Sequence, residues 1–240
     1  MKSGSDRGRS VTTPSRRGGP LLAAEVEGQP ADILGFRHLP AYFAPEQQSE
    51  LLVAVRDVLR RAPLYRPAMP RTGNPLSVEM TNAGELGWVT DRDGGYRYQV
   101  THPATGLPWP AIPDALLQLW RDLAAYPAAP EACLINYYSG GAKMGSHVDA
   151  DEREARAPVI SVSLGDDAVF HVGGLKRSDA KRRLLLKSGD VVVLGGEARR
   201  IYHGIDRLLP GTSQLLPEGG RINLTLRRVT IPPATAAESD

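Results

Sequence analysis

The segment "SHVDADE", residues 146–152, places one histidine and three carboxylates within seven residues. On extended backbone the side chains alternate between two faces, so His147 and Asp149 would point to the same side while Val148 points away. An imidazole and a carboxylate on one face are suited to binding one metal ion. A solvated turn has the same composition, however, and His-x-Asp often occurs by chance. The pattern predicts half of a metal site only if a third ligand lies nearby.

The third ligand would have to come from the remaining histidines, which are His38, His102, His171 and His203. The segment "RRIYHGID" places His203 soon after the apolar run "VVVLGG", where the end of a strand would open onto a pocket. His171 competes with it, but lies within the apolar run "AVFHVGG", where a packed core histidine is more common. Two histidines and one carboxylate form the facial triad of non-haem Fe(II) enzymes. We therefore predict an Fe(II) site formed by His147, Asp149 and a second histidine, with His203 favoured over His171.

The segment "GRINLTLRR" adds a second set of residues with a chemical use. Arg221, Asn223 and Arg227 would share one face of a strand, and the other face would carry apolar side chains, namely Ile222, Leu224 and Leu226. Arginines on a strand usually lie on a solvated face. Beside a facial triad they have another use, because guanidinium groups bind carboxylates through two parallel hydrogen bonds. The dianion 2-oxoglutarate carries a carboxylate at each end, so this face fits it as a cosubstrate.

Two helices and a series of short strands would have to position these residues. Apolar residues at helical spacing predict helices over residues 44–61, with Pro45 in the first turn, and over residues 113–127, ending at Pro127. Short β-type runs broken by Gly, Asp or Ser follow at 133–138, 157–165, 168–174, 182–196 and 220–229. In "LLLKSGDVVV" two strands flank a Ser-Gly-Asp bend. With no long helix between them, the strands should be mostly antiparallel, as in a jelly roll or small barrel.

The composition predicts a soluble protein with a folded core. The chain has 240 residues, 41% of them hydrophobic, and a single cysteine, Cys133. We expect a cytoplasmic monomer with no disulfide framework, no signal peptide and no membrane span. Residues 1–20 contain five basic residues and one acidic residue, and are predicted to be a disordered tail. That tail has either no partner or a weak attraction to phosphate backbones.

Several segments together resemble the AlkB family of Fe(II)- and 2-oxoglutarate-dependent alkylated-DNA repair dioxygenases, in its bacterial form. They are "CLINYYSGGAKMGSHVDADE", "APVISVSLG", "GGLKR", "KRRLLLKSGDVVVLGGEARRIYHGI" and "RINLTLR", with "MTNAGELGWVTDR" and "GLPWPAIP" upstream. The resemblance covers about residues 78–228 in order. It differs in "KMGSHVD", in "DRDGGYRY" and at Ile222 and Leu226, all near the expected pocket.

The resemblance implies a double-stranded β-helix (jelly-roll) core, within a mainly β fold with flanking helices, and a role for each matching residue. Fe(II) would be held by His147, Asp149 and His203. The residues expected to hold 2-oxoglutarate are Asn136, Tyr138, Arg221, Asn223 and Arg227. Trp88 would stack on the damaged base, and the other expected substrate contacts are Met80, Tyr96, Asp151 and Arg177. Glu152 is interpreted as a solvated charge.

The chain is expected to divide into four parts, and the resemblance implies what it does. We expect a tail over 1–20, helices and a nucleotide-recognition region over 21–131, the catalytic core over 132–230 and a disordered tail over 231–240. The expected reaction uses O2 and 2-oxoglutarate to remove N-linked methyl groups from bases such as 1-methyladenine and 3-methylcytosine in single- or double-stranded DNA. A same-fold oxygenase acting on RNA, tRNA or protein is the alternative. A jelly-roll binding module with a structural metal, or none, is a third hypothesis.

Overall fold

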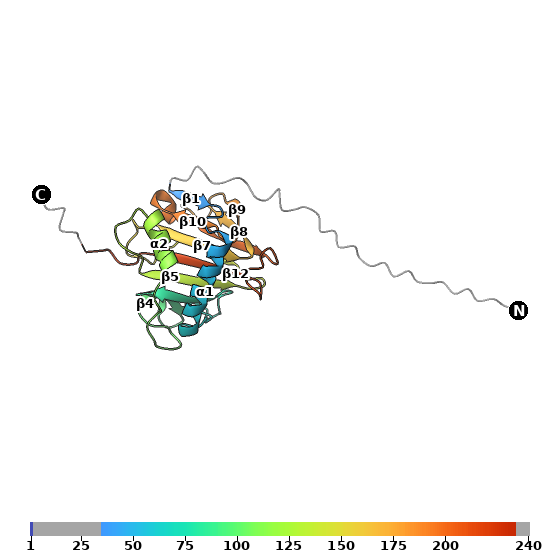
Figure 1. Cartoon of the computed structure of the whole chain (residues 1–240), viewed down its shortest axis with the longest axis horizontal. Helices are drawn as coiled ribbons and strands as arrows, with labels where there is room; N and C mark the ends of the chain where they lie inside the picture. Colours follow the sequence, from blue (N-terminus) through green and yellow to red (C-terminus); the bar gives the residue numbers. More distant parts are fainter. Residues whose placement is uncertain (2–34, 234–240) are drawn as a thin grey trace.

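The computed structural model describes Met1 and residues 35–233. Apart from Met1, the tail predicted at 1–20 lies outside the described residues, as does the C-terminal tail beyond residue 233. The described residues contain two α-helices, a short 3-10 helix and twelve strands (Figure 1). In this part of the chain, no helix is long and apolar enough to cross a membrane.

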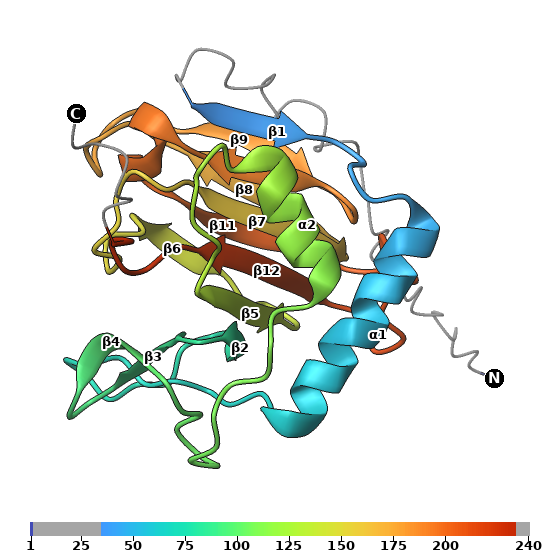
Figure 2. The ribbon, with the colours of Figure 1, turned by 60° about the vertical axis from the view of Figure 1, so that its left-hand side comes forward.

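Both predicted helices are present, and both pack on the same sheet (Figure 2). Helix α1 spans Pro45–Arg61 and buries its apolar stripe, with the Gln47 side chain accepting a hydrogen bond from the Ala44 N–H at 2.9 Å. Helix α2 spans Asp114–Leu123 and is shorter than predicted. Pro127 disfavours helical backbone at the residue before it, and Ala125 already has a positive φ of 46°. The helix therefore ends one turn before the proline.

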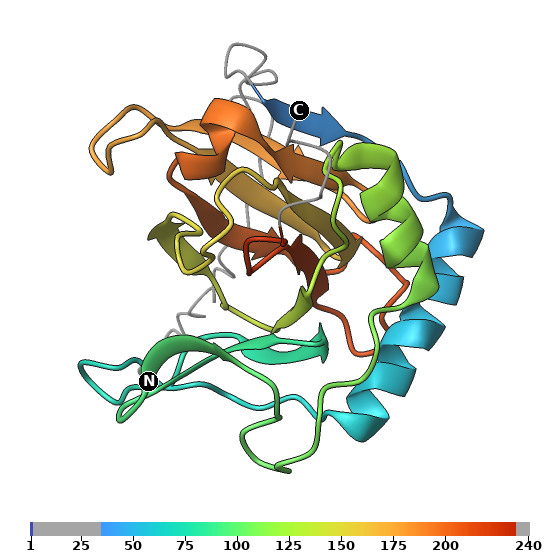
Figure 3. The same cartoon turned by 90° about the vertical axis from the view of Figure 1, so that its left-hand side faces the viewer.

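Two antiparallel sheets face each other behind these helices (Figure 3). The larger sheet has the strand order β1-β10-β7-β12-β5-β2, which are Phe36–Leu39, Val191–Leu194, Val159–Gly165, Arg221–Arg227, Ala132–Tyr138 and Glu79–Gly84. The smaller sheet has the order β6-β11-β8-β9, which are Met144–His147, His203–Leu209, Asp167–Val172 and Arg182–Leu186. A separate hairpin joins β3 (Gly87–Asp91) to β4 (Gly95–Gln99). This arrangement confirms the jelly-roll architecture.

The segment "LLLKSGDVVV" forms two strands joined by a turn, as predicted, but the two strands belong to different sheets. Strand β9 pairs with β8 and strand β10 pairs with β1 and β7. The Asp190 carboxylate holds the turn by accepting hydrogen bonds from the Lys187 N–H at 2.9 Å and the Ala41 N–H at 2.8 Å. His38 Nε2 lies 2.9 Å from the same carboxylate. The turn thus carries the chain from one layer to the other.

Strand β12 lies in the middle of the larger sheet and separates the core from the pocket. It pairs with β5 on one side and β7 on the other, so neither edge is free. Its apolar side chains pack against the helices in one hydrophobic cluster, and they are Ile222, Leu224 and Leu226. Its polar side chains line a cavity between the sheets, and they are Arg221, Asn223, Thr225 and Arg227. The alternation predicted from the sequence is therefore the alternation observed.

Candidate active site

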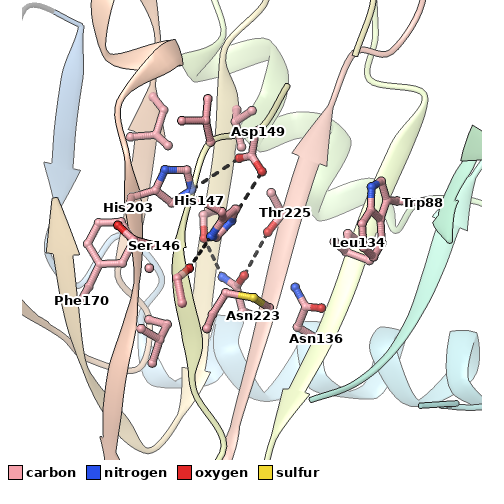
Figure 4. Close-up of a pocket in the computed structure, with 18 of the residues that line it drawn as sticks. Trp88, Leu134, Asn136, Ser146, His147, Asp149, Phe170, His203, Asn223 and Thr225 are labelled. Atoms are coloured by element: carbon pink, nitrogen blue, oxygen red, sulfur yellow. Dashed lines mark hydrogen bonds and ion pairs between the residues drawn. The ribbon is translucent and has the colours of Figure 1, made fainter. Parts of the chain in front are cut away.

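Three side chains converge at the open end of the two facing sheets (Figure 4). His147 ends β6, Asp149 follows two residues later, and His203 begins β11 directly opposite His147 in the ladder. Asp149 Oδ1 lies 3.7 Å from His147 Nε2, and its Oδ2 lies 3.6 Å from His203 Nε2. One nitrogen or oxygen from each of the three residues lies within 4.8 Å of the others. The structure thus brings together the predicted triad.

Main-chain carbonyls fix the orientation of both imidazoles. His147 Nδ1 donates to the carbonyl of Gly145 at 2.9 Å, and His203 Nδ1 donates to the carbonyl of Ile201 at 3.1 Å. Because each Nδ1 is the donor in these bonds, each Nε2 is the ring nitrogen that remains for a metal, and both lie on the side of Asp149. Burial and the neighbouring His203 lower the pKa of His147, which favours the neutral imidazole that a metal requires.

The Asp149 carboxyl is held in its charged form. Burial alone would raise its pKa, but Arg227, followed by His203 and His147, keeps the pKa of Asp149 well below its usual range. Two neutral nitrogen donors and one anionic oxygen are the donor set of a facial triad. The residues present therefore fit Fe(II).

His171, the competing third ligand, has its own partners elsewhere. It lies in β8 with 2% of its surface exposed, and both ring nitrogens are in contact with polar groups. Nδ1 lies 2.7 Å from the Asp206 carboxylate and Nε2 lies 3.1 Å from the Ser146 hydroxyl. His171 is a packed core histidine, as its apolar sequence context indicates.

Arg221 is the most buried cation in the cavity and lacks a full set of partners. Only 1% of its surface is exposed, Nη2 donates to Ser163 Oγ at 2.9 Å, and the guanidinium lies over the Tyr138 ring at 5.4 Å. Its Nε and Nη1 have no hydrogen-bond partner among the described residues, and neither has the buried Asn136 Oδ1. Burial lowers the pKa of Arg221. A buried guanidinium with two unpaired donors fits a carboxylate ligand.

Arg227 lies at the metal end of the same strand face and is paired with two carboxylates. Nη2 donates to Asp149 Oδ1 at 2.6 Å and Nη1 donates to Glu152 Oε1 at 2.9 Å. The prediction that Glu152 is a solvated charge is wrong, because its side chain has no exposed surface and both oxygens accept hydrogen bonds from buried donors. Arg227 Nε is buried without a partner in the described part of the chain.

The five predicted substrate contacts all line the same cavity, which has a volume of about 460 Å³. The Trp88 and Tyr96 rings come from the β3–β4 hairpin and stack with centroids 5.6 Å apart and an interplanar angle of 22°. Trp88 Nε1 donates to Asp151 Oδ2 at 2.7 Å. Met80 is buried in β2, while the Arg177 guanidinium lies 5.2 Å from the centre of the Tyr202 ring. Trp88 stands across the cavity from the triad (Figure 4).

Sequence reasoning missed several residues of this site. Further lining residues are Met69, Leu76, Leu134, Met144, Ser161, Phe170, Leu194 and Thr225. Thr225 had a usable signal, since it lies on β12 two residues from both Asn223 and Arg227, which were predicted. Tyr98 and Arg199 also escaped, because their contacts with Glu152 join segments far apart in the sequence.

The fold and the site together define a class of protein. Two antiparallel sheets face each other, with a His-Asp-His cluster at one end and a buried arginine pair along one strand. This is the arrangement of the jelly-roll oxygenases that use Fe(II) and a 2-oxo acid. The model of the 2OG-Fe(II) oxygenase superfamily matches residues 35–227. The chain belongs to this superfamily and, within it, to the AlkB family.

Two bacterial relatives and one solved structure agree with this placement over most of their length. An alpha-ketoglutarate-dependent dioxygenase AlkB homolog of Caulobacter vibrioides is 51% identical over 81% of this chain and 87% of its own. The alpha-ketoglutarate-dependent dioxygenase AlkB of Escherichia coli is 47% identical over 78% of this chain and 87% of its own. The solved structure of OsALKBH1 matches with a TM-score of 0.69 and 29% identity, over 81% of this chain and 96% of that one. Two more distant relatives match over a smaller part of their length. A DNA N(6)-methyladenine demethylase of Arabidopsis thaliana is 36% identical over 51% of this chain and 43% of its own. A tRNA demethylase of Schizosaccharomyces pombe is 35% identical over 35% of this chain and 28% of its own.

Proposed function

We propose that this protein is an oxidative demethylase that repairs N-alkylated bases, such as 1-methyladenine and 3-methylcytosine, in DNA. The observation that carries the proposal is the pairing of the His-Asp-His cluster with Arg221, a fully buried cation that has two unpaired donors. Leaving such a group without an anion is costly, so the cavity is built for a ligand with carboxylates. Membership of the AlkB family supports 2-oxoglutarate as that ligand.

Each part of the site has a role in this proposal. His147, Asp149 and His203 would hold Fe(II). Arg221 would bind the distal carboxylate of 2-oxoglutarate at the closed end of the cavity, and Arg227, next to Asp149, would bind the end that lies at the metal. The remaining residues assigned to the cosubstrate are Asn136, Tyr138 and Asn223. When bound, Fe(II) and 2-oxoglutarate supply oxidative chemistry that converts 2-oxoglutarate and O2 to succinate and CO2 and removes an N-methyl group as formaldehyde.

The aromatic side of the cavity would receive the damaged base. A base within a duplex cannot reach the triad, so the nucleotide has to be flipped out or already single-stranded. Stacking on Trp88 would return about 1–3 kcal/mol. Met80, Tyr96 and Arg177 would line the same site, and Asp151 would accept hydrogen bonds from an exocyclic amino group. Segment 21–131 would then supply nucleotide recognition and 132–230 the catalytic core. All candidate ligands come from one chain, so the proposed site needs no residue from a second subunit.

A panel of oligonucleotides tests this function. Formaldehyde and succinate are measured with Fe(II), 2-oxoglutarate and 1-methyladenine or 3-methylcytosine, in single-stranded DNA, duplex DNA and RNA of one sequence. With DNA we expect formaldehyde together with at least an equal amount of succinate, and without 2-oxoglutarate we expect neither product. Turnover with RNA alone would support the alternative function, an oxygenase of the same fold that acts on RNA or tRNA. A tRNA demethylase is among the relatives of this chain. No succinate with any substrate would contradict the enzyme class.

A further inference from the structure

Glu152 is a buried charge that the site described above does not use. It follows the metal-ligand segment. Only 7% of the surface of the whole residue is exposed, and none of its side chain is. Oε1 accepts hydrogen bonds from Arg227 Nη1 at 2.9 Å and from the Tyr98 hydroxyl, while Oε2 accepts one from Arg199 Nη2 at 2.8 Å. Attraction by Arg227 outweighs the effect of burial and lowers the pKa of Glu152. Three segments of the chain thus meet on one carboxylate.

Arg199 fixes the backbone around this carboxylate. It lies in the 3-10 helix Gly196–Arg200 and has 3% of its surface exposed. Its Nη1 donates to the main-chain carbonyl of Asp149 and its Nε donates to that of Ala157 at 3.2 Å. Both ends of the segment 149–157 are therefore tied to one guanidinium, which also pairs with Glu152.

The contact between Arg227 and Asp149 involves one oxygen of the carboxylate. Arg227 Nη2 donates to Oδ1 at 2.6 Å, and Oδ2 faces His203 Nε2 at 3.6 Å. An arginine with no other partner prefers to bind a carboxylate with two parallel hydrogen bonds. Here the second amino group of Arg227, Nη1, is occupied by Glu152 and by the Tyr98 hydroxyl at 3.1 Å. That occupation keeps the end-on pair of Nη1 and Nη2 from binding both Asp149 oxygens, and Oδ2 receives no hydrogen bond from Arg227.

We propose that Glu152 is a positioning residue for the metal site: it holds Arg227 in the orientation that contacts Asp149 through a single oxygen, and Tyr98 and Arg199 hold Glu152. The inference rests on the proposed function, because it assigns Asp149 as a metal ligand. The four charged side chains, Asp149, Glu152, Arg199 and Arg227, are two acids and two bases. Removing the Glu152 charge leaves Arg227 to pair with Asp149 alone, in direct competition with the metal.

The test is metal affinity in the protein without its cosubstrate. Mn(II) binding to the metal-free full-length protein is measured by calorimetry for the wild type, Glu152→Gln and Tyr98→Phe. Losing a hydrogen bond between charged groups predicts roughly a tenfold or greater fall in Mn(II) affinity for Glu152→Gln. We expect a smaller fall for Tyr98→Phe, which removes one donor to Glu152 and keeps the charges.

Glu131 provides the matched control. It is equally buried, at 7% exposure, and accepts hydrogen bonds from the Val229 N–H at 2.9 Å and the Thr230 N–H at 2.6 Å, just beyond the end of β12. Glu131→Gln should lower the thermal midpoint and leave Mn(II) affinity unchanged. Equal losses of Mn(II) affinity in Glu131→Gln and Glu152→Gln at similar thermal midpoints would assign Glu152 a structural role only.

A double substitution separates action through Arg227 from a general loss of charge. In an Arg227→Met background the competing guanidinium is gone, so Glu152→Gln should lose most of its effect on Mn(II) affinity. A loss of the same size in both backgrounds would overturn the positioning role. Wild-type protein that does not bind Mn(II) would instead refute the metal site itself, whereas wild-type binding with an unaffected Glu152→Gln variant would refute only this inference.

Discussion

His171 and His203 both adjoin apolar runs in the sequence, yet their polar partners give them different chemistry. His203 directs Nε2 at Asp149, whereas both nitrogens of His171 are in contact with Asp206 and Ser146. We expect His203→Ala to abolish turnover and greatly weaken Fe(II) binding, and His171→Ala to preserve Fe(II) binding with some loss of stability. Calorimetric metal binding and succinate release measure both effects. Loss of the metal in the His171 variant alone would show that the third ligand is wrongly assigned.

Arg221 allows a test of hydrogen-bond geometry with a substitution that keeps the positive charge. Its Nε and Nη1 are unpaired in the described structure, and lysine cannot offer two parallel donors from one position. Arg221→Lys should therefore weaken 2-oxoglutarate binding by about 1.5–3 kcal/mol, the range for hydrogen bonds to charged groups. The affinity is measured calorimetrically on the Mn(II)-loaded protein without oxygen. Unchanged affinity would remove Arg221 from the cosubstrate site.

Trp88 and Asp151 are expected to affect the substrate and to leave formation of the oxidant intact. Trp88→Ala removes stacking of about 1–3 kcal/mol and should raise the half-saturating DNA concentration roughly 5–150-fold. Asp151→Ala should change which methylated base is preferred, and it also removes the acceptor of the Trp88 indole N–H. In both variants slow succinate formation without DNA should persist. If either variant loses that background as fully as His147→Ala, the residue supports the metal centre.

At the scale of single elements, the features that could be predicted follow from the local alternation of polar and apolar residues. The features that could not be predicted depend on pairing between segments far apart in the sequence. The polar and apolar faces of β12 follow from strand alternation alone, so its arginines were correctly placed on one side. Strand β6, "MGSH", carries no apolar alternation and is a strand because it pairs with β11. Glu152 was misread because its partners Tyr98, Arg199 and Arg227 lie 54, 47 and 75 residues away.

The turn between β9 and β10 offers a test of how one element depends on another. Gly189 has a φ of +88°, and a Cβ placed there would lie 2.4 Å from Gln48 Nε2 and 2.6 Å from the Phe43 carbonyl oxygen. Gly189→Ala therefore combines backbone strain with a clash against the start of α1. Gly211 has a similar φ of +78° with nothing within 4 Å of the added carbon, so Gly211→Ala shows the cost of strain alone.

We expect Gly211→Ala to cost about 1 kcal/mol of unfolding free energy and Gly189→Ala to cost about 1–3 kcal/mol more, because overpacking adds to the strain. Urea unfolding followed by circular dichroism gives both values. Equal losses for the two variants would mean that the Gln48 side chain and the Phe43 backbone move aside without cost.

At the scale of the whole molecule, the helices, the larger sheet and the site share strand β12. One face of this strand packs in the main hydrophobic cluster, and the other carries Arg221 and Arg227, the arginines proposed to bind 2-oxoglutarate. Ligand binding should therefore stabilise the fold as a unit, and Cys133 can report it. This cysteine, the only one in the sequence, lies in β5 beside β12 and is fully buried, which raises its thiol pKa to about 12. A buried, protonated thiol reacts with alkylating reagents only after the structure opens.

Alkylation of Cys133 should consequently be slow in the native protein and slower still with ligands. Mn(II) with 2-oxoglutarate at 100 times its dissociation constant stabilises the folded state by about 2.7 kcal/mol. If Cys133 becomes accessible only by global unfolding, this stabilisation lowers the labelling rate about 100-fold. Arg221→Lys should reduce that protection at the same 2-oxoglutarate concentration. A labelling rate that ligands leave unchanged would show that β5 opens locally, independently of the site on β12, and that the shared strand does not couple ligand binding to the core.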